Sequence, residues 1–151
     1  MLDDLETYEK ECEKIRKENA RLLDEFSAWL SEKGLSEKTV QNHCENMEFY
    51  LNHYLLYEDA EDAASGVSPF RVCDFLGNWF IRKAMWASKA SIKSNGASLK
   101  KFYSFMAEKG LVDKDDLDVL KEVIKEEMPE WLETIAKYDD PDVEFEDIWG
   151  F

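Results

Sequence analysis

Apolar side chains recur at three- and four-residue steps along almost the whole chain, and no stretch alternates apolar and polar positions with a period of two. Steps of three or four residues place side chains on one face of an α-helix, whereas strands require the period of two. With 44% hydrophobic and 13% aromatic residues, the chain can bury a core of its own. The sequence therefore predicts a single all-α domain, a compact bundle.

Turn and capping residues divide this pattern into about five helices, each bounded by a glycine, a proline or a hydroxyl-bearing cap. The expected helices span about residues 3–33, 36–55, 69–83, 89–110 and 113–138. The small, acidic segment 58–67 predicts a surface loop. Pro129 is expected to bend or restart the last helix, because its ring removes a donor and clashes with the preceding turn.

The first expected helix carries a heptad pattern in addition to ordinary amphipathicity. Its steps alternate between three and four residues and include one polar member: Leu5, Tyr8, Cys12, Ile15, Asn19, Leu22, Phe26 and Trp29. One hypothesis packs this stripe within the chain, against the fifth expected helix. The other makes it the seam of a homodimer, in which an asparagine fixes the register. The pattern leaves both open.

The net charge of −15 opposes a nucleic-acid partner, because affinity for DNA comes mainly from lysine and arginine at phosphates. The acidic residues are concentrated at the two ends. Residues 1–74 hold 8 Lys/Arg against 18 Asp/Glu, residues 75–107 hold 6 against none, and residues 108–151 hold 5 against 16. Any DNA hypothesis is therefore directed to residues 75–107.

Three segments in the middle of the chain resemble a known domain. Residues 22–51 (LLDEFSAWLSEKGLSEKTVQNHCENMEFYL), 67–80 (VSPFRVCDFLGNWF) and 91–112 (SIKSNGASLKKFYSFMAEKGLV) are similar, in order and spacing, to the core-binding (SAM-like) domain of phage-integrase-type tyrosine recombinases. The resemblance implies an integrase-like, SAM-like fold with a long N-terminal helix and an added C-terminal helix. The expected division is a helical extension, the core-binding-like domain, a packed helix and an acidic aromatic tail, at residues 1–21, 22–112, 113–138 and 139–151.

In that family the domain forms one half of a clamp around duplex DNA, and its second and fourth helices face the duplex. The resemblance implies DNA contacts by ten residues: Lys38, Thr39, Asn42, His43, Lys89, Ser91, Lys93, Asn95, Lys100 and Lys101. Spacing supports part of this set independently, because Lys89, Lys93 and Lys100 fall within about 40° of one another on a helix. Such a row suits phosphate contact; a plain solvated helix face is the other interpretation.

No catalytic or metal-binding motif is evident. The family's chemistry resides in a separate C-terminal domain with a tyrosine, arginines, a lysine and a His-x-x-Arg pair, and residues 113–151 contain neither histidine nor arginine. We therefore expect no enzyme activity, no cofactor and no metal site. His43 and His53 are spaced for different helix faces. The cysteines lack CxxC spacing and are expected to be buried as small hydrophobic side chains: Cys12, Cys44 and Cys73.

The acidic tail, residues 139–151, also holds apolar side chains that suit a groove on a protein partner: Phe145, Ile148, Trp149 and Phe151. In the alternatives, these side chains fold back on the domain, or the acidic tail covers the lysine row and suppresses DNA contact.

Two functions remain after these arguments. The first is a non-catalytic, accessory DNA-binding module in recombination or integration. The second is a protein-interaction module that kept the fold, lost DNA binding and assembles through the heptad helix and the tail. The total charge favours the second and the local charge map favours the first. Because the sequence has no leader-like start and no long apolar run, we expect no membrane span and a cytoplasmic location.

Overall fold

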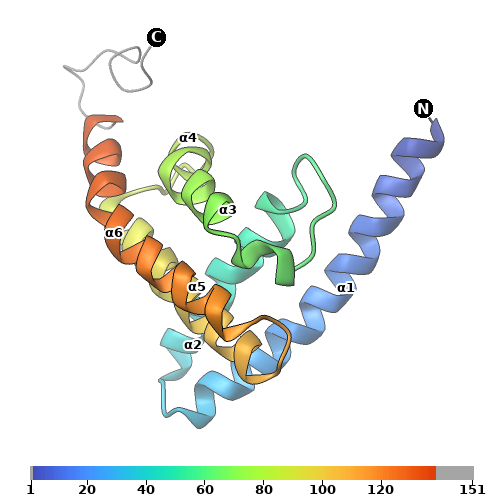
Figure 1. The fold of residues 1–151 in the computed structure, drawn as a ribbon, viewed down its shortest axis with the longest axis horizontal. Coiled ribbons are helices and arrows are strands. Elements are labelled where there is room, and N and C mark those ends of the chain that lie inside the picture. Colours follow the sequence, from blue (N-terminus) through green and yellow to red (C-terminus); the bar gives the residue numbers. More distant parts are fainter. Residues whose placement is uncertain (1, 139–151) are drawn as a thin grey trace.

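The computed structural model describes residues 2–138, with side chains from residue 4 onward, and every regular element in that range is helical (Figure 1). The elements are α1 (Leu2–Glu32), α2 (Glu37–Phe49), η1 (Tyr50–Tyr54), η2 (Ala64–Val67), α3 (Pro69–Asp74), η3 (Phe75–Trp79), α4 (Phe80–Lys83), α5 (Lys89–Glu108) and α6 (Lys114–Tyr138). The prediction of an all-α protein with about five main helices is confirmed.

The helix ends lie where the capping residues predict them. Gly34 and Gly110 adopt positive φ angles of 89° and 74° directly after α1 and α5, a conformation that other residues rarely adopt. Ser36 caps α2 by accepting a hydrogen bond from the backbone N–H of Thr39. Ser88 begins α5 with a reciprocal capping box. The helix α6 continues through the exposed Pro129 and does not restart there.

Two π-helical turns interrupt the expected second and third helices. The turn η1 continues α2, and η3 joins α3 to α4. Their aromatic side chains meet in the core, where the ring centroids of Tyr50 and Phe75 are 4.9 Å apart and those of Tyr54 and Trp79 are 5.3 Å apart. Spacing alone did not predict these turns, because a π turn adds only one residue to an otherwise helical pattern.

The heptad stripe of α1 is divided between two clusters. Its inner half enters the main core, where Leu22 and Phe26 are buried, whereas Cys12 and Ile15 form a smaller cluster with Leu56. The stripe packs mainly against α2 and η1, and less against α5. The stripe therefore packs within the chain. Its partner is not α6, the fifth expected helix, because α6 packs on α5 and α3.

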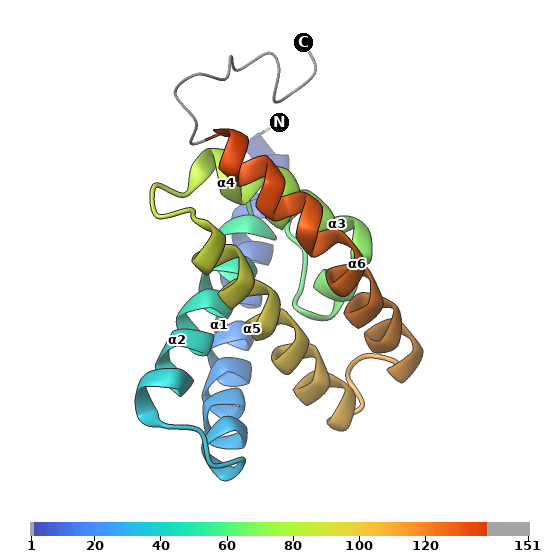
Figure 2. The ribbon, with the colours of Figure 1, turned by 90° about the vertical axis from the view of Figure 1, so that its left-hand side faces the viewer.

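The helix α5 lies at the centre of the arrangement, between α2 and α6 (Figure 2). It forms an antiparallel pair with α6, since the short 109–113 connection reverses the chain and Gly96 lies against Ile124 and Met128. A methyl carbon at Gly96 would lie 2.7 Å from Cε of Met128, so glycine permits this close approach. Among the described helices, none combines the length and the apolar character needed to cross a bilayer.

Candidate nucleic-acid interface

Three of the predicted lysines share an exposed row on α5. Lys89, Lys93 and Lys100 are all exposed, and their spacing places them on the flank of α5 that borders α6, next to Gly96. The buried side of the same helix carries Ile92, Leu99 and other core residues. The structure therefore places this predicted row on the surface.

The neighbouring flank of α6 adds two lysines to this row. Lys121 and Lys125 precede Met128 by about two turns and one turn and are exposed, so they lie on the side of α6 that Met128 occupies. Because Met128 contacts Gly96 and the helices are antiparallel, both lysine rows border the same outer side of the α5–α6 pair. We call this surface the basic face: Lys89, Lys93, Lys100, Lys121 and Lys125.

Within the described residues, the lysines of the basic face form no ion pair. On α5 no acidic residue lies near them, because residues 75–107 contain no Asp or Glu. On α6 helical spacing puts Asp118 about 20° from Lys125 around the helix, and the charge of Lys125 acts on the neighbouring Glu126. The α5 side of the face is therefore cationic, whereas its α6 side carries both signs of charge.

The predicted residues of α2 divide into exposed and buried groups. Lys38, Thr39 and Asn42 are exposed, whereas His43 is only 6% exposed. Asn42 donates a hydrogen bond to Oγ of Ser94, 2.9 Å away on α5. The structure thus brings the two predicted helices side by side, with their polar groups engaged across the contact.

A buried polar network joins α2 to α5 behind these residues. Ser98 Oγ lies 2.7 Å from Nδ1 of His43, accepts a hydrogen bond from Asn46 at 3.0 Å, and donates to the carbonyl of Ser94 at 3.0 Å. The direction of the hydrogen bond between His43 and Ser98 depends on the tautomer of the imidazole. Asn46 was missed by the sequence analysis, because an asparagine on a helix has no distinctive spacing.

Burial and the nearby charge of Lys101 lower the pKa of His43 below its ordinary value of 6.5. The imidazole is therefore neutral at pH 7, and its ring serves the network rather than a phosphate.

The remaining predicted residues of α5 have local structural roles. Ser91 completes the capping box with Ser88. Asn95 is 3% exposed and donates to the carbonyl of Ser91 at 2.8 Å. Lys101 is half-buried near His43. These positions, like His43, do not contribute exposed side chains to the basic face.

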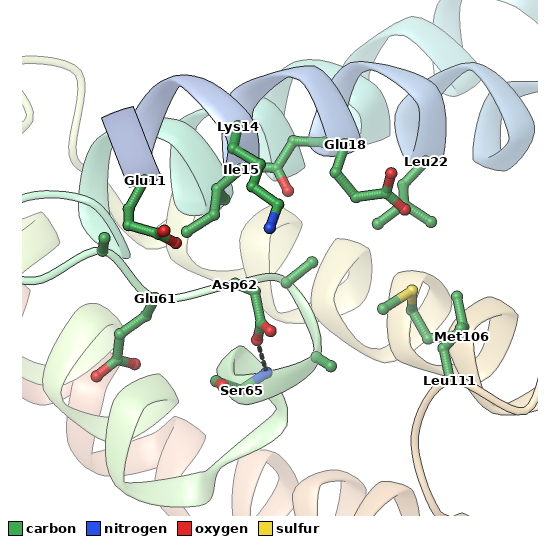
Figure 3. Close-up of a pocket in the computed structure, with 14 residues that line it drawn as sticks. Glu11, Lys14, Ile15, Glu18, Leu22, Glu61, Asp62, Ser65, Met106 and Leu111 are labelled. Carbon is green, nitrogen blue, oxygen red and sulfur yellow. Dashed lines mark hydrogen bonds between the residues drawn. The ribbon is translucent and has the colours of Figure 1, made fainter. Parts of the chain in front are cut away.

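A second polar region is a groove between α1 and residues 60–65 (Figure 3). It has a volume of about 530 Å³. Glu11 and Glu18 extend from α1 on one side, and Asp62 on the other accepts a hydrogen bond from the backbone N–H of Ser65. Asn19 also lines it and is almost fully buried, with its Oδ1 unpaired. The groove is acidic and would repel phosphate.

Within residues 2–138, no three His, Cys, Asp or Glu side chains are grouped to hold a metal ion. Cys12, Cys44 and Cys73 are free thiols, and burial raises the pKa of the latter two. The tail residues predicted to bind a partner lie outside the described residues: Phe145, Ile148, Trp149 and Phe151.

Comparisons of the chain with protein-family models, with curated proteins and with solved structures give no match.

Proposed function

We propose that this chain is a non-catalytic DNA-binding module that contacts the phosphates of duplex DNA through its basic face. The observation that carries the proposal is the concentration of five exposed lysines, without carboxylate partners in the described part of the chain, around the contact between α5 and α6. Long cationic side chains on a rigid helix pair provide the phosphate contacts on which sequence-independent DNA affinity depends.

The dimensions of the face also suit a duplex. Lys89 and Lys100 lie about 16 Å apart along α5, and the major groove of B-DNA is about 12 Å wide. One row can therefore reach phosphates on both sides of a groove. Lys121 and Lys125 extend the contact sideways on α6. The exposed Lys38 and Asn42 of α2 border the opposite side of α5.

The resemblance to a recombinase core-binding domain supports a more specific role. In that family the equivalents of α2 and α5 face DNA, and here these two helices are in direct contact. On this basis the proposed role is accessory, holding or regulating DNA during recombination or integration, with bond cleavage performed by another polypeptide domain.

The test is a fluorescence-anisotropy titration with a labelled duplex at several salt concentrations. If each lysine of the basic face neutralises one phosphate, the logarithm of the association constant falls against the logarithm of salt with a slope of about −4.5. Charge reversal of Lys89, Lys93 and Lys100 to glutamate is expected to lower affinity by at least about 100-fold and to reduce the slope.

The matched control changes three lysines of α1, Lys10, Lys14 and Lys17, to glutamate. It alters the net charge by the same amount on the acidic side of the molecule. If both triple variants bind equally, or if the unmodified chain shows no salt-dependent binding, the proposal is wrong.

A further inference from the structure

An exposed apolar turn lies at the beginning of the basic face. Met85 is 99% exposed and Trp86 is 57% exposed, and they lie four and three residues before Lys89, where α5 begins. Exposure of large apolar side chains to water is unfavourable, and burial of these two neighbours against a partner would be favourable. Neither residue was singled out by the sequence analysis, because a Met-Trp pair in a short connection has no periodicity.

The turn is held in place by contacts on both sides. The Trp86 ring packs against Phe49, with centroids 5.1 Å apart, and against Phe80 at 6.2 Å. The Trp86 carbonyl accepts a hydrogen bond from Ser91 Oγ, and Ala87 N–H donates to the carbonyl of Ala84. Met85 therefore projects from a backbone turn that is held in place by its neighbours.

Cationic side chains lie on both sides of the turn along the chain. Lys83 is in the last turn of α4 and Lys89 is in the first turn of α5. An apolar side chain between lysines suits a ligand with anionic groups on its surface and stacked apolar groups within. A nucleic-acid duplex is such a ligand, with phosphates outside and stacked bases inside.

We infer that Met85, supported by Trp86, is a wedge that inserts between base pairs of the bound duplex and bends it. This inference rests on the proposed function, and it adds a preference for DNA sequences that deform easily. Pyrimidine–purine steps such as TA unstack readily, whereas A-tracts are stiff. Lysines bind phosphates in either sequence, so the wedge alone produces the preference.

The experiment compares two duplexes of equal length and charge, one of repeated TA steps and one with an A-tract. The unmodified chain is expected to bind the TA duplex about tenfold more tightly, because wedge insertion costs less there. It is also expected to raise the fluorescence of 2-aminopurine placed at a TA step, as that base loses its stacking. Met85→Ser, which removes no packed side chain, is expected to abolish both effects and to keep the salt slope.

Phe70→Ser is the matched control, because Phe70 is 73% exposed on α3; it is expected to behave as the unmodified chain does. Trp86→Ala is expected to weaken the TA preference without abolishing salt-dependent binding. If the chain binds DNA with a normal salt slope but shows no TA preference and no fluorescence rise, the wedge is wrong and the proposed function stands. If no salt-dependent binding occurs, both are wrong.

Discussion

The cations of α1 and those of the basic face are arranged in opposite ways. On α1, Lys17 lies 3.6 Å from a carboxylate oxygen of Glu13, and Arg21 pairs with both Glu18 and Glu25. These pairs join residues one turn apart on the same helix. The lysines of the basic face have no such partner in residues 4–138.

Pairs one turn apart stabilise a helix modestly. This accounts for Lys17 and Arg21 of α1, whereas Lys10 and Lys14 are exposed without an ion pair in the described residues. Like charges gathered across two helices repel one another and give the fold no comparable gain.

After the triple variant of α5, the largest effect that distinguishes the two surfaces is expected on α6. Reversal of Lys121 and Lys125 to glutamate is expected to lower the affinity for duplex DNA by about 30-fold or more, because two phosphate contacts are lost and two repulsions are added. The same change at Lys10 and Lys17 of α1 is expected to lower affinity by less than about threefold, through long-range charge alone. Anisotropy titration at one salt concentration measures both.

The α6 variant has a further use, because Lys121 and Lys125 were absent from the set that the sequence predicted. If their reversal has no more effect than the α1 control, the basic face ends at α5. The proposed DNA contact would then be limited to the three lysines of α5, Lys89, Lys93 and Lys100.

The all-helical class and the helix bounds could be predicted from local signals, because those signals are strong in this sequence. Apolar steps of three and four residues gave the helices, and Gly34, Ser36 and Gly110 gave their ends. The packing partner of α1 could not be predicted, because any apolar stripe can pack against any other. The hydrogen bond from Asn19 Nδ2 to Asn52 Oδ1, at 2.8 Å, forms only because α1 packs against η1.

The candidate site was predictable only where it lies on one helix. The lysine row of α5 followed from spacing within α5, whereas Lys121 and Lys125 join it through the contact of Gly96 with Met128. That contact is a property of the tertiary structure. His43 and Asn95 were expected to face DNA, but their burial depends on the approach of α2 to α5 and on the core, which sequence spacing does not reveal.

The pH dependence of stability is expected to distinguish His43, between α2 and α5, from the paired carboxylates of α1. The folded state lowers the pKa of His43, first by burial and then by Lys101, so the protonated imidazole is favoured in the unfolded chain. Stability from this group is fully present above about pH 6.5 and is lost as the pH falls below that value. Urea unfolding of the unmodified chain between pH 7.5 and 5 should therefore show a declining free energy, and His43→Asn should reduce the decline.

The carboxylates of α1 respond in a lower window. Hydrogen bonds from Arg21 and Lys109 lower the pKa values of Glu18 and Glu25 below the ordinary 4.5, so their contribution is present above about pH 4.5 and is lost below it. Glu25→Gln is the control, because it should lower the free energy of unfolding by a constant amount above about pH 4.5 and change its pH dependence only below that value. Equal slopes for His43→Asn and the unmodified chain between pH 7.5 and 5 would contradict the burial of a neutral histidine.

The smallest effect is expected at the outer end of α1, where the homodimer hypothesis is tested. A coiled-coil seam requires successive heptad positions to be available. Here Tyr8 donates a hydrogen bond to the carbonyl of Leu56, and Cys12 and Ile15 pack in the same cluster, while Leu5 remains 54% exposed. One exposed leucine is too little apolar area for a stable dimer. Sedimentation equilibrium is therefore expected to give a monomer for both the unmodified chain and Leu5→Asp, whereas a dimer that Leu5→Asp dissociates would show that α1 exchanges its internal partners for a second copy.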